Sequence, residues 1–169
     1  REPVQGPMAR WQTSRWVLDD VVLQEAGFGQ SVRCLRETPD DAQWLYPGWT
    51  VVLFPDDAEG YWLNATSPTP CWFVMWRMEV DYQEYLEPNS IASVDNQDGA
   101  GIAIPHRLML SYNEAARLVD GGESVDTAPL QAEMKSYLAD YVAANYKPEP
   151  KKRAKPASFK GANRPAEPQ

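Results

Sequence analysis

The composition of the chain changes abruptly at Lys147, and this change limits which residues can belong to a folded core. Residues 1–146 carry 9 Lys and Arg against 22 Asp and Glu, a net charge of about −13, whereas residues 147–169 carry 7 against 2, a net charge of about +5. Repeated prolines in the basic part remove amide donors and block a helix. We therefore predict a flexible N-terminus at 1–10, a single domain at 11–146 and a basic, proline-rich tail at 147–169.

A run of β-branched and aromatic residues dominates the middle of the domain. Residues 49–54 and 61–65 flank a turn at 55–60, and a second turn separates them from residues 71–80. This pattern predicts three consecutive strands of an antiparallel sheet, the first two forming a hairpin. Because residues 71–80 are apolar on both faces over their first half, they are typical of a central strand covered on both sides, or of a barrel wall.

The remaining pattern predicts further strands followed by helices. Strands are expected within residues 11–23 and at 32–36 and 106–110, with a variable loop at 81–105. Ser111 is expected to cap a helix over 113–119, with Glu114 completing a capping box, and Gly121 and Gly122 to end it. Thr127 is expected to cap a last helix that ends near residue 145. The members of its apolar face recur every three or four positions: Leu130, Met134, Tyr137, Leu138, Tyr141 and Val142. The predicted fold class is α+β, with an antiparallel sheet or a partly open β-barrel and two C-terminal helices.

No catalytic, cofactor-binding or metal-binding constellation is recognised in the sequence. His106 is the one histidine, and no nucleophile or second metal ligand accompanies it in a motif. The Asp doublets at 19–20, 40–41 and 56–57 fall at predicted turns, which favours solvated turn residues over a carboxylate pair. Cys34 and Cys71 lack ligand spacing, so we expect reduced, metal-free thiols, although a single disulfide between them stays open. We therefore predict no enzyme and no cofactor.

Hydropathy and charge restrict location and partners. No apolar run reaches the ~20 residues of a membrane span, and no signal-peptide core follows the first charges, so we expect a cytoplasmic protein. The low pI of about 4.7 disfavours binding to nucleic acid. The tail can be a solvated, solubilising segment or can dock on an acidic protein. The residues that we expect to bind a partner are aromatic side chains of the central run and basic side chains of the tail: Trp49, Trp62, Trp72, Trp76, Lys147, Lys151, Lys152, Arg153, Lys155 and Lys160.

Five motifs in order resemble an uncharacterised bacterial domain family. They lie at 46–50 (YPGWT), 59–64 (EGYWLN), 70–77 (PCWFVMWR), 110–118 (LSYNEAARL) and 145–150 (NYKPEP). The resemblance covers roughly residues 10 to 153 and leaves out 81–105. Genes of that family tend to lie beside those of molybdenum- or tungsten-dependent formate dehydrogenases, which implies a role in making, regulating or completing such an enzyme. It implies no catalytic residue.

The combined expectation is a non-catalytic accessory protein or small subunit of a formate dehydrogenase system, bound to an enzyme subunit through the aromatic run and the tail. A second hypothesis is a cofactor-handling protein or small enzyme of molybdenum-cofactor delivery, which needs a deep pocket with several Arg or Lys side chains. A third is a nucleic-acid-binding module, which the acidic charge disfavours.

Overall fold

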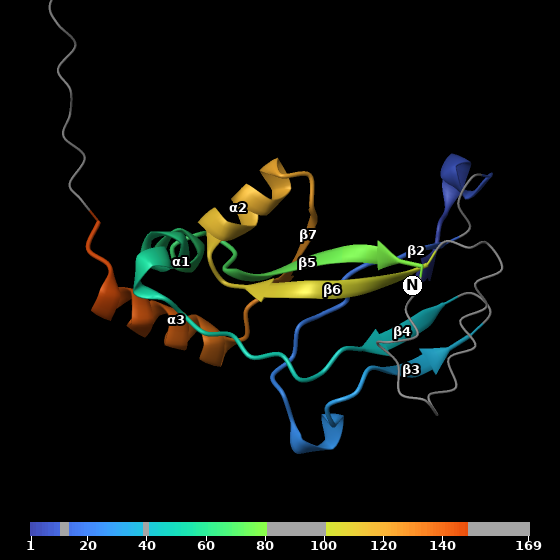
Figure 1. The fold of residues 1–169 in the computed structure, drawn as a ribbon, viewed down its shortest axis with the longest axis horizontal. Coiled ribbons are helices and arrows are strands. Elements are labelled where there is room, and N and C mark those ends of the chain that lie inside the picture. The colour runs from blue at the N-terminus through green and yellow to red at the C-terminus, as the bar shows by residue number, and fades with distance from the viewer. Residues whose placement is uncertain (11–13, 39–40, 81–100, 149–169) are drawn as a thin grey trace, which may run out of the picture.

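The centre of the molecule is a three-stranded antiparallel sheet (Figure 1). The computed structural model describes residues 1–10, 14–38, 41–80 and 101–148. β5 (Cys71–Glu79) lies between β6 (Ile102–Met109) and β7 (Ser124–Pro129). The predicted central strand at 71–80 is therefore confirmed.

The register of the sheet shifts at one point along β5. The pairing of β5 with β6 is irregular between Met75 and Trp76, and Trp76 lies opposite Pro105. Proline has no amide hydrogen to donate to a ladder, so a bulge is expected beside it. The pairing of β5 with β7 runs without a shift from Cys71 opposite Pro129 to Trp76 opposite Ser124.

Successive side chains of β5 enter two different cores. Phe73 and Met75 pack with Met109 and Ala115 on the face covered by α2 (Tyr112–Asp120). Trp72 points to the opposite face and packs with residues of β6, α1 (Ala58–Ala65) and α3 (Ala132–Asn145). Since successive residues of a strand point to opposite faces, burial on both sides explains the continuous apolar run.

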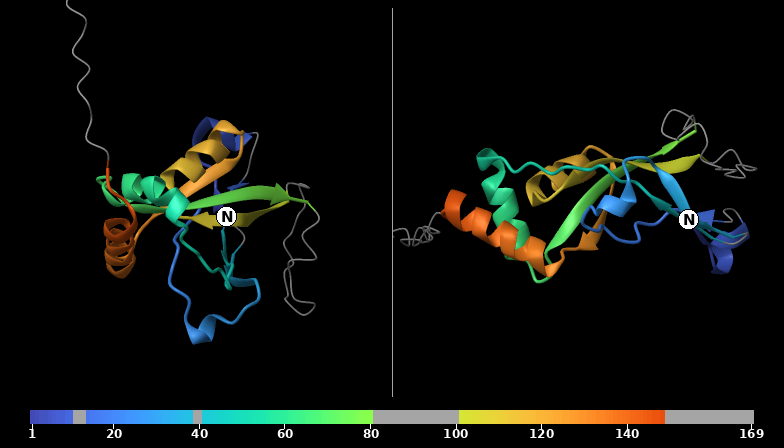
Figure 2. Two further views of the ribbon diagram at one scale, coloured as in Figure 1. Left: turned by 60° about the vertical axis from the view of Figure 1, so that its left-hand side comes forward. Right: turned by 90° about the horizontal axis from the view of Figure 1, so that it is seen from below.

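The helices gather around one end of the sheet, and two small strand pairs lie toward the other end (Figure 2). β1 (Glu2–Pro3) pairs with β2 (Ser14–Arg15), and β3 (Arg33–Glu37) pairs with β4 (Ala42–Leu45). Three short 3₁₀ helices complete the described elements: η1 (Gly6–Arg10), η2 (Ala26–Phe28) and η3 (Pro55–Asp57). The described sheets are antiparallel and open, so the fold is α+β without a barrel.

The predicted hairpin of residues 49–54 and 61–65 is wrong. Residues 61–65 belong to α1, and residues 49–54 form no strand. Pro55 opens η3, and acidic side chains at the start of α1 suit the positive end of a helix dipole. Ala58, Tyr61 and Asn64 are buried at three-residue spacing. The burial of this helical face outweighs the β-propensity of the aromatic residues.

The predicted start of the last helix at Thr127 is also wrong. Thr127 lies in β7 opposite Phe73, and α3 begins at Ala132 after Gln131. Pairing of this segment with β5 competes with a helical start, and the sheet contact wins. The apolar face predicted for the helix is correct in part, because Leu138 and Val142 are buried in the core beside Leu130.

The other sequence expectations have mixed outcomes. The helix over 113–119 is confirmed within α2, and Ser111 Oγ accepts from Glu114 N at 3.2 Å. The strand at 32–36 is confirmed as β3, and the strand at 106–110 is confirmed but begins earlier, at Ile102, inside the segment expected to be a loop. Within 11–23 the described residues contain only the short β2, and 81–100 lie outside the described residues. No helix in the described ranges has the length and apolar character needed to cross a bilayer.

Candidate partner-binding surface

The four tryptophans expected on a binding surface lie in four different environments. Trp72 is only 4 % exposed, and its indole nitrogen donates to Gln131 Oε1 at 3.1 Å, so this residue belongs to the core. Trp62 is half-buried against the ring of Tyr146, with a centroid separation of 5.5 Å. Trp76 is half-buried, and its indole nitrogen donates to Asp126 at 3.0 Å.

Trp49 is the exposed member of the set. It begins a stretch of residues 49–54, which we call the aromatic segment, and 39 % of Trp49 is exposed. Val52 and Phe54 on the same segment are 61 % and 57 % exposed, whereas Val51 and Leu53 pack against the core. Of the basic residues, Lys147 is exposed, and the others lie outside the described residues. The structure therefore brings exposed apolar side chains together on the aromatic segment.

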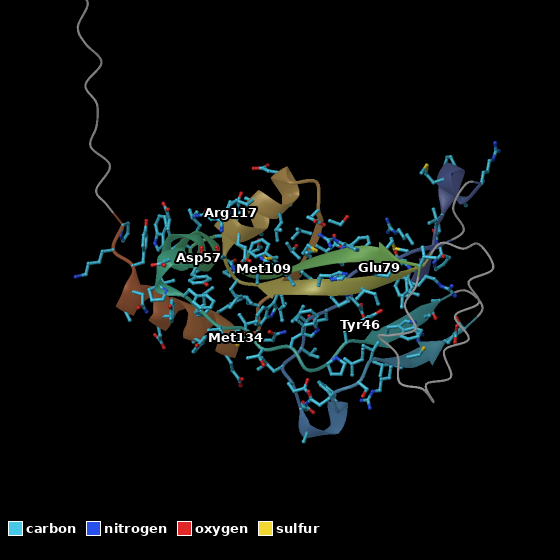
Figure 3. The ribbon with its side chains drawn as sticks, in the orientation of Figure 1. Tyr46, Asp57, Glu79, Met109, Arg117 and Met134 are labelled. Atoms are coloured by element: carbon cyan, nitrogen blue, oxygen red, sulfur yellow. The ribbon has the colours of Figure 1, made fainter. Side chains whose placement is uncertain are left out.

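A hollow of about 250 Å³ lies between the aromatic segment and the outer side of β6. We call it the edge groove. Its walls come from residues 49–52 and Phe54 on one side and from residues 106–110 on the other, with Tyr61 and Glu114 completing it. In Figure 3 the labelled Met109 marks the end of β6 that forms part of this groove. The groove thus combines an open sheet edge with exposed aromatic side chains.

Both long walls of the edge groove have unpaired backbone. Residues 49–53 make no backbone hydrogen bond within the described parts of the chain, although Gly48 N donates to Gln24 and Phe54 N donates to the Tyr61 hydroxyl. In β6, the backbone of residues 106–109 has no partner other than β5 among the described residues. On either side of this stretch of β6 the carbonyl groups have partners, because the Tyr46 hydroxyl donates to Ala103 O and the Asn64 side-chain amide donates to Leu110 O.

A second, larger groove of about 490 Å³ lies between the N-terminal part of the chain and the β5–β6 face of the sheet. Aromatic side chains line it, including Trp16, Trp44, Tyr46 and Trp76. Tyr46 points toward β6 (Figure 3), its hydroxyl donates to Ala103 O at 2.9 Å, and burial raises its pKa so that it stays protonated. The sequence analysis did not find this groove because its walls come from segments far apart in the chain.

The charges around the larger groove do not form a phosphate cradle. Three arginines and five carboxylates line it: Arg1, Arg33, Arg36, Glu2, Asp19, Asp20, Asp41 and Asp126. Arg36 is paired with Asp41 at 2.8 Å, and Arg33 donates to Gly27 O. A site for an anionic cofactor needs converging cations in excess, whereas carboxylates outnumber arginines in this lining.

The titratable side chains beside the sheet contact one another in pairs. His106 Nε2 lies 3.0 Å from Glu79 Oε1, and Arg107 lies 2.7 Å from Glu114. The Arg77 guanidinium binds Glu123, which lowers the pKa of that carboxyl. Arg117 on α2 faces Asp57 at the start of α1 at 3.7 Å (Figure 3). Among the described residues, no three His, Cys, Asp or Glu side chains converge as metal ligands.

The two cysteines are free, and both are half-buried. Burial raises the pKa of the Cys34 thiol, with a further contribution from Glu37, and burial alone raises the pKa of the Cys71 thiol. Since the thiolate is the reactive form, both thiols should react slowly. We expect alkylation by iodoacetamide at pH 8 to be several-fold slower in the native chain than in the same chain unfolded in guanidinium. Peptide mass spectrometry measures each site separately, and a faster native rate at either cysteine contradicts this expectation.

Comparison with known proteins identifies the family of the chain. The model of the family described as "Protein of unknown function (DUF3305)" matches residues 1–155, and the chain belongs to this family. No curated protein and no solved structure matches the chain. The match covers the central sheet, the described helices and the edge groove.

Proposed function

We propose that the protein is a non-catalytic accessory protein or small subunit of a molybdenum- or tungsten-dependent formate dehydrogenase, with a role in assembly, maturation or complex formation. The observation that carries a binding role is the edge groove, where exposed Trp49, Val52 and Phe54 lie beside backbone that is unpaired among the described residues. The choice of enzyme rests on the resemblance of the five sequence motifs.

Aromatic anchors and open main chain are the features that supply affinity at protein interfaces. Large aromatic side chains dominate binding free energy when a partner removes them from water. An isolated exposed apolar side chain is ordinary on a monomer, but three on one short segment next to a groove form a coherent surface. This surface supports a binding role more directly than either groove supports catalysis.

The basic tail should add an electrostatic contribution. Tyr146 packs on Trp62, and Trp62 follows Tyr61 of the edge groove, so the tail leaves the domain near this groove. Its seven basic residues against two acidic ones favour an acidic surface on the partner. Such attraction is screened beyond a Debye length of about 8 Å at physiological salt.

The cofactor-handling hypothesis has less support. The larger groove has a volume within the range of small-molecule sites, about 300–1,000 Å³. However, more carboxylates than arginines line it, and Arg36 is committed to Asp41. An anionic pterin cofactor would meet repulsion there, so we rank this function second.

Trp49→Ala tests the aromatic segment. We expect the variant to bind purified formate dehydrogenase from the native host at least about tenfold more weakly, because truncating a central aromatic anchor costs about 2 kcal/mol or more. Met8→Ala is the matched control, since Met8 is an exposed apolar residue on η1. Equal binding of both variants, measured by surface plasmon resonance, would contradict the role of the aromatic segment, and absence of binding by the unchanged protein would overturn the proposed function.

Removal of the tail after Tyr146 tests the electrostatic contribution. We expect an unchanged melting temperature, a slower association rate at low salt and a weaker dependence of that rate on salt. The measurements are thermal unfolding and binding kinetics at low and high ionic strength. Unchanged kinetics would show that the tail only solubilises the protein, whereas a loss of folded structure would make the tail part of the domain.

A further inference from the structure

We infer that the edge groove is a receptor for an extended strand of the partner protein, which pairs with β6 and carries acidic residues at the end nearest the tail. This inference rests on the proposed function for the identity of the partner and deepens it by stating the chemistry that the groove recognises. An open strand edge is a template for another strand, and β-strand addition is a common mode of peptide recognition.

The hydrogen-bonding groups of β6 define the first requirement on the occupant. The sheet order places β6 at an edge, with β5 as its one strand neighbour in the described chain. Residues 106–109 have no other backbone partner there, while Ala103 O and Leu110 O accept from Tyr46 and Asn64 side chains. The open stretch is thus bounded on both sides by satisfied groups, and a short extended segment would complete it.

The opposite wall defines the second requirement. The aromatic segment presents a backbone that has no partner in the described chain over residues 49–53, and exposed side chains at Trp49, Val52 and Phe54. A chain that offers both main-chain donors and acceptors and alternating apolar side chains satisfies both walls. An extended peptide has these properties, because its side chains alternate while its N–H and C=O groups point sideways.

Charge defines the third requirement. The Tyr61 end of the edge groove is adjacent to Trp62, which Tyr146 covers, and the exposed Lys147 follows at once. Three further basic residues come within the next six positions, at Lys151, Lys152 and Arg153. A partner strand with Asp or Glu at this end of its apolar core complements Lys147 and the basic sequence that follows it. A strand with basic flanks would be repelled at the same end.

The probe for this inference is a synthetic decapeptide, Asp-Glu-Thr-Val-Thr-Val-Thr-Val-Asp-Glu, added to the full-length protein. We expect hydrogen exchange at residues 49–53 and 106–109 to slow on binding. A peptide of the same sequence with alternate backbone N-methyl groups keeps the side chains but loses donors, and it should not protect these residues. A peptide with Lys and Arg in place of the acidic flanks should bind at least about tenfold more weakly at low salt, and the difference should shrink at high salt.

A pair of variants separates backbone from side-chain recognition. Val52→Pro removes one amide hydrogen and replaces the side chain by a ring, whereas Val52→Ala shortens only the side chain. We expect the Pro variant to lose more affinity than the Ala variant for both the probe and the purified enzyme. The inference is overturned if the acidic-flanked peptide does not bind, or if it slows hydrogen exchange at other residues instead. It is also overturned if the N-methylated peptide protects the same residues equally well, or if β6 pairs with a second copy of the chain in concentration-dependent dimers. Specific peptide binding together with no enzyme binding supports the strand receptor and overturns only the proposed function.

Discussion

Replacing Asn64 by Asp is expected to lower the free energy of unfolding by about 3–5 kcal/mol at pH 7. Asn64 is 1 % exposed, and its amide nitrogen donates to Cys71 O at 2.8 Å and to Leu110 O at 2.9 Å. Its amide oxygen accepts from Cys71 N at 3.0 Å. One side chain therefore joins α1 to the start of β5 and the end of β6. A carboxylate has no hydrogen to donate and would face two carbonyl oxygens in a buried position.

The pH dependence of Asn64→Asp provides an additional test. Burial and the two carbonyl oxygens should raise the pKa of the introduced carboxyl above its unfolded value. The folded state then favours the protonated form, so the loss of stability should be smaller at pH 5 than at pH 7. Urea unfolding at pH 5 and at pH 7 measures this loss of unfolding free energy, with Asn145→Asp as the control.

The control and a second substitution make the Asn64 test decisive. Asn145 is exposed at the end of α3, and its one side-chain hydrogen bond within the described residues goes to Tyr141 O four residues earlier, so Asn145→Asp should cost less than about 1 kcal/mol. Asn64→Leu keeps a similar volume but leaves the groups on Cys71 and Leu110 unsatisfied, and it should also be strongly destabilising. Similar unfolding midpoints for the Asn64 and Asn145 variants would contradict the bridging role.

Gly60→Ala is expected to destabilise the protein by about 1–3 kcal/mol, although alanine is the better helix former. A Cβ at this position would lie 2.2 Å from Ser111 Oγ and 3.2 Å from Asn113 N. Ser111 is fully buried and caps α2 through Glu114 N, so its side chain cannot turn away without loss of the cap. The glycine therefore permits α1 to lie directly against the start of α2.

Two further variants identify the cause of this destabilisation. Gly27→Ala is the control, since a Cβ there meets nothing within 4 Å, and it should leave stability unchanged or slightly higher. Ser111→Ala removes the clashing oxygen together with the cap, so the double variant should be more stable than the sum of the two single effects implies. Thermal and urea unfolding measure all four proteins. Strict additivity of the Gly60 and Ser111 effects would place the origin of the loss elsewhere.

The elements that were correctly predicted are those whose local signals agree with their tertiary surroundings. Residues 71–76 are apolar at successive positions, and the sheet buries Trp72 on one face and Phe73 and Met75 on the other, in two cores. Ser111 precedes a sequence suited to a helix, and it caps α2 as expected. The Glu114 side chain, however, binds Arg107 on the neighbouring strand, a contact that no short motif encodes.

The candidate site was predicted only in part. The aromatic run drew attention to the right region, and Trp49 is exposed there. Trp72 and Trp76 occur four residues apart in one strand and have different roles, since Trp72 faces the core formed with α3 and Trp76 lines the larger groove. Composition cannot separate these roles, because exposure depends on which distant segment covers each ring.

Local signals alone account for the change of charge at Lys147, the central position of β5 and the start of α2, because each depends on composition, on a continuous apolar run or on a cap. Long-range contacts instead make residues 58–65 a helix, place Thr127 in β7 and leave residues 49–54 without a strand partner among the described residues. Intrinsic β-propensities differ by only about 1 kcal/mol. Burial of Tyr61 in the core and the hydrogen bonds of Asn64 outweigh such differences, and both depend on residues far away in the chain.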